Sequence, residues 1–327
     1  MDKNGQLTFS DDPLLNSTSE AYQLLEEGNF ELSAEKFDSM MTLDPDYPGV
    51  IEGYRTAKFW NNRHKELMSL EDGKQTADFL MRQWEVFEKY SAEKSITGSA
   101  AYYSIMRHIF NRASEHYRTA YIDHQDTPND FNLLLNLGSC FLRLEDYKKT
   151  IETLEFARNS YTSNAKLLFI LAEAYFHENE IPKCLLYFKE AFNINPSDLD
   201  LSIIKSKPIL QIIESINETK IAYKDLKEWI PVYGFLTDIF YVRKNLSKHQ
   251  IDTLQDEIYN LETAFQKMSK DQIENSNVKP RLINKYILML DYYEFQNYNF
   301  ENIVQIRERL INIDKDMFKE YFSKKKS

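Results

Sequence analysis

The segment FNLLLNLGSCFLRLEDYKKTIETLEFARNSYTSN (residues 131–164) is followed directly by AKLLFILAEAYFHENEIPKCLLYFKEAFNINPSD (residues 165–198), and both have the same length of 34 residues. Equivalent positions carry similar residue types: Leu134 and Leu168, Leu137 and Leu171, Gly138 and Ala172, Phe141 and Tyr175, Thr150 and Cys184, and Ala157 and Ala191. A fixed period of this length indicates stacked supersecondary units and not one closed core. Apolar residues spaced by three and four predict that each unit is a pair of helices.

The composition of the whole chain favours the same fold class. Of 327 residues, 43% are hydrophobic and 14% aromatic, which is ample material for a buried core. Only 8 Gly and 9 Pro occur, too few for the turn-dense chains of sandwiches and barrels. Two cysteines make no disulfide framework, and both are interpreted as small core residues. The formal net charge of −11 argues against a nucleic-acid binder, which needs clustered Lys and Arg.

Membrane insertion is not expected. The longest charge-free runs span about a dozen residues, and a helix needs about 20 to cross a bilayer. The N-terminus has no apolar core of signal-peptide length, so we expect a cytoplasmic protein.

The N-terminal part has a looser form of the repeat. Residues 1–16 are expected to be a flexible lead-in, followed by a helical hairpin over residues 17–47 that opens with a capping box at Ser17–Glu20. Between residues 48 and 127 the period is blurred and the number of repeats stays open. The pattern over residues 99–122 leaves open whether this segment is one long helix or the second half of a hairpin.

After Asp198 the register is lost, and residues 199–327 are predicted to form a divergent all-helical region. Proline and glycine at Pro208, Pro231 and Gly234 are expected to interrupt helical patterns. A second capping box, at Ser247–Gln250, opens a helix with a narrow apolar seam. The favoured interpretation is that the seam packs against a neighbouring helix of this chain; a dimer seam is the alternative.

The central pair resembles the tetratricopeptide repeat family. In residues 165–198 the family's slots for large, small and aromatic residues and for proline are met at Leu168, Leu171, Ala172, Tyr175, Cys184, Phe188, Ala191 and Pro196. The first segment departs from the pattern at Leu154 and Thr162, and the hairpin at 17–47 carries Met40 where a small residue is usual. The resemblance implies a right-handed superhelical array of helical hairpins, an α-solenoid, over residues 17–198.

In such an array the first helices of the hairpins form a concave inner face. The positions that the resemblance assigns to this groove and its flanks are Asn132, Leu135, Ser139, Leu142, Arg143, Lys166, Phe169, Glu173, Phe176 and His177. An apolar groove suits an extended peptide or an amphipathic helix of a partner. The alternative is that a later helix of this chain fills the groove. The residues at the groove also differ from the Lys and Asn pattern with which one subtype of the family binds the acidic tails of chaperones.

Motifs of catalysis and of metal or cofactor binding are missing from the sequence. It lacks the phosphate-binding and dinucleotide-binding glycine patterns, the H-E-x-x-H and C-x-x-C motifs and the G-x-S-x-G elbow, and its 6 histidines are scattered. We therefore expect no catalytic residues, no metal and no cofactor. The sequence indicates a non-enzymatic scaffold or adaptor for another protein; the resemblance adds assembly of bacterial envelope, secretion or flagellar machinery as an expectation. A regulator or sensor of a small peptide ligand is the alternative.

Overall fold

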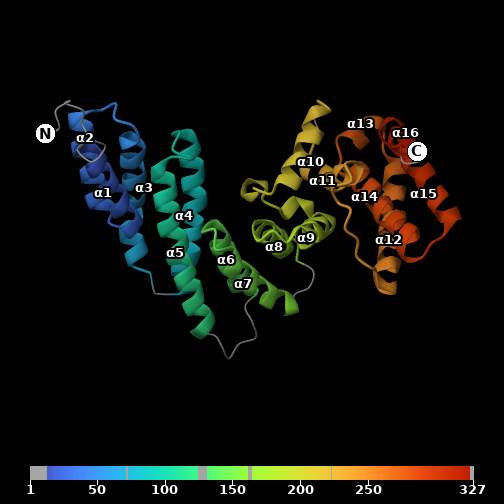
Figure 1. The fold of residues 1–327 in the computed structure, drawn as a ribbon, viewed down its shortest axis with the longest axis horizontal. Coiled ribbons are helices and arrows are strands. Elements are labelled where there is room, and N and C mark those ends of the chain that lie inside the picture. Colours follow the sequence, from blue (N-terminus) through green and yellow to red (C-terminus); the bar gives the residue numbers. More distant parts are fainter. Residues whose placement is uncertain (1–12, 71–72, 124–130, 161–163, 222, 325–327) are drawn as a thin grey trace, which may run out of the picture. The chain divides into compact units, whose positions relative to one another are not determined.

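The computed structural model describes residues 13–70, 73–123, 131–160, 164–221 and 223–324. Within these ranges every regular element is a helix, and the prediction of an all-α chain is confirmed there. Helices that follow each other along the sequence pack in pairs (Figure 1). The packing divides the chain into two compact units, which we call unit 1 (Met1–Ala157) and unit 2 (Arg158–Ser327).

Helix α5 is the centre of unit 1. The helices of this unit are α1 (Pro13–Glu27), α2 (Phe30–Leu43), α3 (Val50–Met68), α4 (Lys74–Glu93), α5 (Ala100–Asp123), α6 (Phe131–Arg143) and most of α7 (Tyr147–Ser160). Helix α5 is one long helix, which answers the question left open by the sequence, and it packs against α1, α4 and α6. The contact with α1 includes two hydrogen bonds from the Arg107 guanidinium to the Glu26 carboxylate, at 2.8 and 2.9 Å. In an array of stacked hairpins each repeat contacts its neighbours, so the α1–α5 contact is a departure from simple stacking.

Aromatic side chains fill the core of unit 1. Trp84 packs with its ring centroid 5.0 Å from that of Phe110 and 5.4 Å from that of Phe87. Trp60 adds a further ring 5.7 Å from Phe87. Aromatic pairs at such distances bury large apolar areas and prefer tilted or edge-on geometry. The core therefore joins α3, α4 and α5 into one body.

The first helix begins earlier than the sequence predicted. Helix α1 starts at Pro13, a residue type favoured in the first turn of a helix. Ser17 and Glu20 thus lie inside the helix, and the capping box predicted there is wrong. The next helix, α2, spans Phe30–Leu43 and stops before Pro45.

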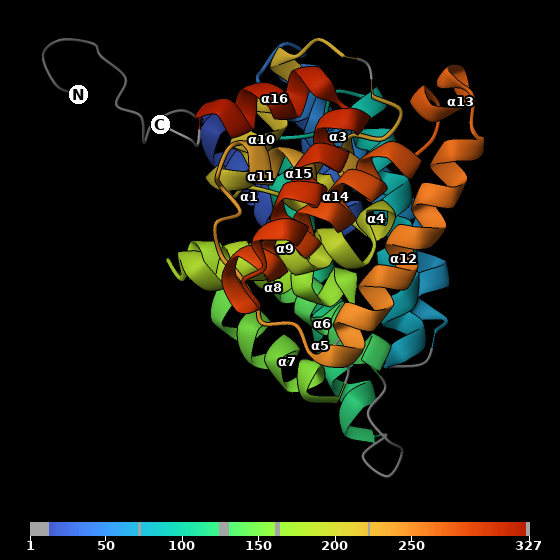
Figure 2. The ribbon, with the colours of Figure 1, turned by 90° about the vertical axis from the view of Figure 1, so that its right-hand side faces the viewer.

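The regular elements among the described residues of unit 2 are all helices. They are α8 (Ala165–His177), α9 (Ile181–Ile194), η2 (Pro196–Asp198), η3 (Leu201–Ile203), α10 (Lys207–Glu218), α11 (Leu226–Leu236), α12 (Lys248–Lys267), α13 (Lys270–Glu274), α14 (Val278–Asp291), η4 (Tyr292–Gln296), α15 (Phe300–Ile313) and α16 (Lys315–Lys324). Helix α11 contacts α9, α10 and α14, and α14 in turn contacts α12 and α15 (Figure 2). Helices α11 and α14 therefore form the middle of the unit.

Two predictions about prolines in unit 2 are wrong. Pro208 lies in the first turn of α10 and so begins a helix there. Pro231 lies inside α11, which continues through Gly234 to Leu236. Proline removes one backbone hydrogen bond from a helix, but burial of α11 on both sides of Pro231 offsets that loss.

The capping box at Ser247 is confirmed. The Ser247 hydroxyl accepts from the Gln250 N–H, and the Gln250 side chain accepts from the Ser247 N–H. The apolar seam of the helix that follows, α12, is buried at Ile251, Leu254 and Ile258, and the helix packs on α14 of the same chain. The favoured interpretation of the seam therefore agrees with the structure.

Candidate functional site

The groove positions predicted on α6 lie in unit 1 and are only partly open to solvent. Asn132 is exposed, Leu135 and Ser139 are half-buried, and Leu142 is buried. Arg143 is tied to its own unit, since its guanidinium lies 3.5 Å from the Glu88 carboxylate and 6.0 Å from the ring centre of Phe110. Helix α6 thus presents a short, mixed surface and not a continuous apolar stripe.

The groove positions predicted on α8 lie in unit 2, and the two central ones are closed. The Phe169 side chain is 1% exposed, with its ring 5.4 Å from that of Phe188 and 5.8 Å from that of Phe192. Both partners belong to α9, so Phe169 packs inside its own hairpin. Phe176 and His177 are half-buried, and Lys166 is exposed. The expectation that Phe169 faces an open groove is corrected by these contacts.

Glu173 is covered by a later part of the chain. Its carboxylate is 1% exposed and accepts a hydrogen bond of 2.6 Å from the Lys205 N–H, just after η3. The His177 imidazole lies 3.4 Å from the same oxygen. Burial raises the pKa of Glu173, and the Lys205 N–H and His177 oppose that shift. The cover at Glu173 is therefore a connecting segment, and not the later helix that the sequence left open as an alternative occupant of the groove.

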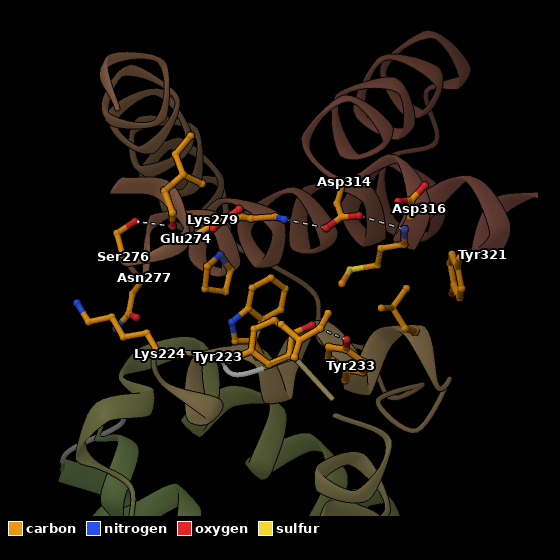
Figure 3. Close-up of a pocket in the computed structure, with 16 residues that line it drawn as sticks. Tyr223, Lys224, Tyr233, Glu274, Ser276, Asn277, Lys279, Asp314, Asp316 and Tyr321 are labelled. Atoms are coloured by element: carbon orange, nitrogen blue, oxygen red, sulfur yellow. Dashed lines mark hydrogen bonds and ion pairs between the residues drawn. The ribbon is translucent and has the colours of Figure 1, made fainter. Parts of the chain in front are cut away.

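A cavity of unit 2 lies beside helices α11 and α14. It has a volume of about 730 Å³ and is bounded by the α10–α11 connection, α11, the α13–α14 connection and the start of α16 (Figure 3). We call it the aromatic pocket. None of its residues was predicted as a site. The available signal was the aromatic run Tyr223, Trp229 and Tyr233 around Pro231, which the sequence presents as helix-breaking.

Three aromatic rings form the floor of the aromatic pocket. The ring centroid of Tyr223 lies 4.3 Å from that of Trp229 and 6.3 Å from that of Tyr233. The hydroxyls of the two tyrosines are 2.8 Å apart and share a hydrogen bond. Burial raises the pKa of Tyr233, and the neighbouring Tyr223 adds to this. The floor is thus apolar at the ring faces and has one polar point at the paired hydroxyls.

A charged pair forms the opposite wall. Lys279 of α14 donates to the Asp314 carboxylate at 2.8 Å, and its ammonium lies 5.9 Å from the ring centre of Trp229. Asp314 also accepts from the Met317 N–H at 3.1 Å and so caps the first turn of α16. The pocket is also lined by three exposed charged residues of both signs, which are Lys224, Glu274 and Asp316.

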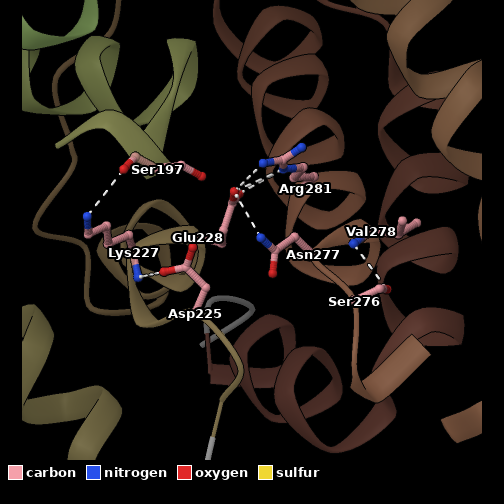
Figure 4. A network of polar contacts seen from close by, with 8 residues as sticks. All are labelled: Ser197, Asp225, Lys227, Glu228, Ser276, Asn277, Val278 and Arg281. Carbon is pink, nitrogen blue, oxygen red and sulfur yellow. Dashed lines mark hydrogen bonds and ion pairs between the residues drawn. The ribbon is translucent and has the colours of Figure 1, made fainter. Parts of the chain in front are cut away.

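A buried carboxylate links the two helices that carry the pocket. Glu228 of α11 is 2% exposed and accepts from the Arg281 guanidinium of α14 and, at 3.4 Å, from the Asn277 side chain (Figure 4). At the start of α11, the Asp225 carboxylate accepts from the Lys227 N–H at 3.1 Å. A buried charge with charge-assisted partners has a fixed geometry. The network therefore links α11 to α14, the two helices beside the pocket.

In the aromatic pocket, Lys279 and Asp314 neutralise each other, and the hydroxyls of Tyr223 and Tyr233 bond to each other. Across the residues that the structure describes, no three side chains of His, Cys, Asp and Glu come together in a way that would hold a metal ion. In the same ranges, every helix is too short or too polar to cross a membrane. Comparisons with models of known protein families and with curated proteins found no match.

Proposed function

We propose that this protein is a non-catalytic scaffold or adaptor, built from tetratricopeptide-like helical hairpins, that binds a segment of another protein in the aromatic pocket of unit 2. The observation that carries the proposal is the combination of a concave aromatic floor with a rim of exposed charges. Protein interfaces have this anatomy, with an apolar centre rich in Tyr and Trp and a polar rim. We place docking in the pocket, and not on the positions expected on α6 and α8, because the side chains of Phe169 and Glu173 are buried.

The size of the pocket indicates what part of a partner enters it. A volume of about 730 Å³ lies in the range of sites that enclose a small ligand, and it is too small for a whole helix. One or two anchor side chains of a peptide or of an amphipathic helix suit it. We propose that an apolar or aromatic anchor packs on Trp229 and Tyr223, while the main chain of the partner lies at the charged rim.

Site-specific crosslinking tests the proposal. A photoreactive phenylalanine analogue at Leu236, a pocket residue, is expected to crosslink the partner in cells, and mass spectrometry of the product gives the contacting segment. The dissociation constant of that segment is then measured as a synthetic peptide. We expect Tyr223→Ala and Ile221→Asp to weaken binding at least tenfold, because each removes apolar surface of the pocket.

The matched control is Tyr298→Ala. Tyr298 is a large side chain of the same unit, 72% exposed, and it does not line the pocket. Its replacement is expected to leave the dissociation constant unchanged. If both pocket variants bind the segment as tightly as the wild type, docking in the aromatic pocket is refuted.

The second candidate is a sensor of a small peptide ligand, and the enclosed volume of the same pocket favours it. A ligand that binds only the folded state raises the melting temperature by mass action. A library of di- and tripeptides would then stabilise the wild type and not Tyr223→Ala. An adaptor, in contrast, responds to the longer crosslinked segment and not to the short peptides.

A further inference from the structure

An extended segment connects α11 to α12. Residues 241–247 of the sequence, YVRKNLS, form neither helix nor turn, and we call them the strap. The strap lies along a surface made by α9, α14 and η4, all within unit 2. Its contacts with that surface involve both its main chain and its basic side chains.

The main chain of the strap is bound at both ends. Gln296 of η4 accepts from the Leu246 N–H at 2.8 Å and donates to the Leu246 carbonyl at 2.7 Å. At the other end, the Lys189 ammonium of α9 donates to the Val242 carbonyl at 3.3 Å. A side-chain amide that contacts both groups of one residue imitates the partner strand of a sheet. Main-chain bonds of this kind hold any extended peptide whatever its sequence.

The basic side chains of the strap meet acidic and aromatic residues. The Arg243 guanidinium lies 3.5 Å from the ring centre of Phe295 and 3.7 Å from the Asp291 carboxylate. Lys244 forms an ion pair of 2.7 Å with Glu190 of α9. A cavity of about 210 Å³, lined by residues of the strap and of this surface, has room for additional side-chain atoms. Asp291 also pairs with Lys189 of α9 at 2.7 Å, so its carboxylate is shared between that lysine and Arg243. The surface therefore offers Glu190 to one basic residue, and the Phe295 ring with the shared Asp291 carboxylate to the next.

We propose that this surface, the strap groove, is a second binding site, which takes an extended segment of a partner with two adjacent basic residues. In the free protein the strap occupies the groove in place of that segment. The site is separate from the aromatic pocket, and the inference goes beyond the function proposed above.

The position of the strap makes an exchange feasible. The side chain of Arg243 is 44% exposed and Phe295 is 56% exposed, so the strap leaves without opening the core. Ion pairs at exposed positions are individually weak. The strap stays bound because it is tethered, which gives it a high effective concentration at the groove.

The acidic residue Glu190 makes the strap groove favour an incoming segment that carries basic residues. The Glu190 side chain is 19% exposed and pairs with Lys244. When the strap leaves, this half-buried carboxylate loses a cation, which is unfavourable unless the incoming segment supplies another. A neutral or acidic segment lacks that compensation. The groove is thus selective for basic segments although its main-chain contacts are not selective.

A peptide with the strap sequence, acetylated and amidated at its ends and carrying a fluorophore, tests the proposal by anisotropy. The full-length variant Arg243→Ser/Lys244→Ser loosens the strap and leaves the groove intact. We expect the peptide to bind this variant at least tenfold more tightly than the wild type. Adding Glu190→Gln and Asp291→Asn is expected to abolish the binding, and the peptide YVSSNLS is expected not to bind.

The control Lys267→Ser/Lys270→Ser removes two exposed lysines of unit 2 outside the strap and is expected to behave as the wild type. Equal affinity of wild type and strap variant, or no binding to a folded strap variant, overturns the proposal. If the strap variant does not fold, hydrogen exchange of the wild-type protein tests the proposal instead. Excess peptide must then increase exchange of the Leu246 N–H, and unchanged exchange overturns the proposal. Tyr223→Ala affects none of these results, so failure here is distinct from failure of the aromatic pocket.

Discussion

Gly138 of α6 lies directly against Leu154 of α7, so closely that a Cβ atom at Gly138 would stand 2.5 Å from the Leu154 side chain. Both residues are in unit 1, and Leu154 is fully buried. Gly138 is the equivalent of Ala172 in the next segment, and a small residue at this position lets the two helices of a hairpin approach closely. The contact between Gly138 and Leu154 is such a close approach.

The first testable prediction is that Gly138→Ala destabilises the protein. Overpacking costs about 1–3 kcal/mol and opposes the gain of about 1 kcal/mol from replacing glycine by alanine in a helix. We expect a net loss of stability in urea unfolding. In the background of Leu154→Ala, which removes the contacting atoms, the same change should become neutral or stabilising. An identical effect of Gly138→Ala in both backgrounds would contradict the close contact.

A second prediction concerns the buried carboxylate of Glu228. Arg281→Met leaves this charge without its guanidinium, and breaking a buried pair costs about 3–5 kcal/mol. Because the Arg281 side chain is 46% exposed, water reaches the pair, and we expect a loss at or below the lower end of that range. The double variant Glu228→Gln/Arg281→Met should lose less than Arg281→Met alone.

The control for this prediction is Lys183→Met, which breaks an exposed pair with Glu180. Both side chains of that pair are 52% exposed. Its loss should cost about 0–1 kcal/mol. A cost of Arg281→Met no greater than that of Lys183→Met would mean that the Glu228 network does not stabilise the contact between α11 and α14.

The third prediction is a dependence of stability on pH through Glu173. Burial raises the pKa of Glu173 above its ordinary value of 4.5. Between pH 4.5 and the raised pKa, the folded state therefore holds a proton that the unfolded state has lost. The stabilising contribution is therefore complete below pH 4.5 and is lost as the pH rises through the raised pKa. Glu173→Gln cannot titrate and keeps an oxygen for the Lys205 N–H. It should be more stable than the wild type at pH 7 and equal to it below pH 4.5.

Urea unfolding at a series of pH values measures this difference. Glu178→Gln, at an exposed glutamate just after α8, is the matched control and should follow the wild type at every pH. A difference between Glu173→Gln and the wild type that does not change with pH would show that Glu173 does not titrate in this way.

The sequence predicted best where local chemistry decides the structure. The capping box at Ser247 needs only residues within one turn, and it is present. Ser17 has the same residue pattern, but Pro13 starts the helix earlier, so a stronger start signal upstream overrides a good cap. Pro231 shows the reverse effect: packing on both sides of α11 keeps the helix intact where the local rule predicts an interruption.

The site could not be predicted because it depends on contacts between distant segments. The sequence pattern of α8 places Phe169 and Glu173 on one face of the helix. That face is buried by contacts with the segment around Lys205 and with the aromatic rings of α9, and the pattern does not show these contacts. The aromatic pocket likewise joins Trp229 with Lys279 and Asp314, which are far apart in the sequence. Periodicity assigns faces to helices and does not show which faces meet.

The fourth prediction uses the two cysteines as separate reporters, since Cys140 lies in unit 1 and Cys184 in unit 2. Burial raises the pKa of each thiol to about 12, with a further contribution from the Glu173 carboxylate at Cys184. The thiolate is the reactive form, so neither cysteine should react with a thiol reagent at pH 8 until its unit unfolds. Labelling in increasing urea, followed by peptide mapping, measures the two unfolding midpoints separately. If the units unfold independently, Gly138→Ala should lower the unfolding midpoint at Cys140 and leave the midpoint at Cys184 unchanged. Equal shifts of the two midpoints would mean that the units unfold as one body. Rapid labelling of Cys184 without urea would contradict the closed packing of α8 on α9.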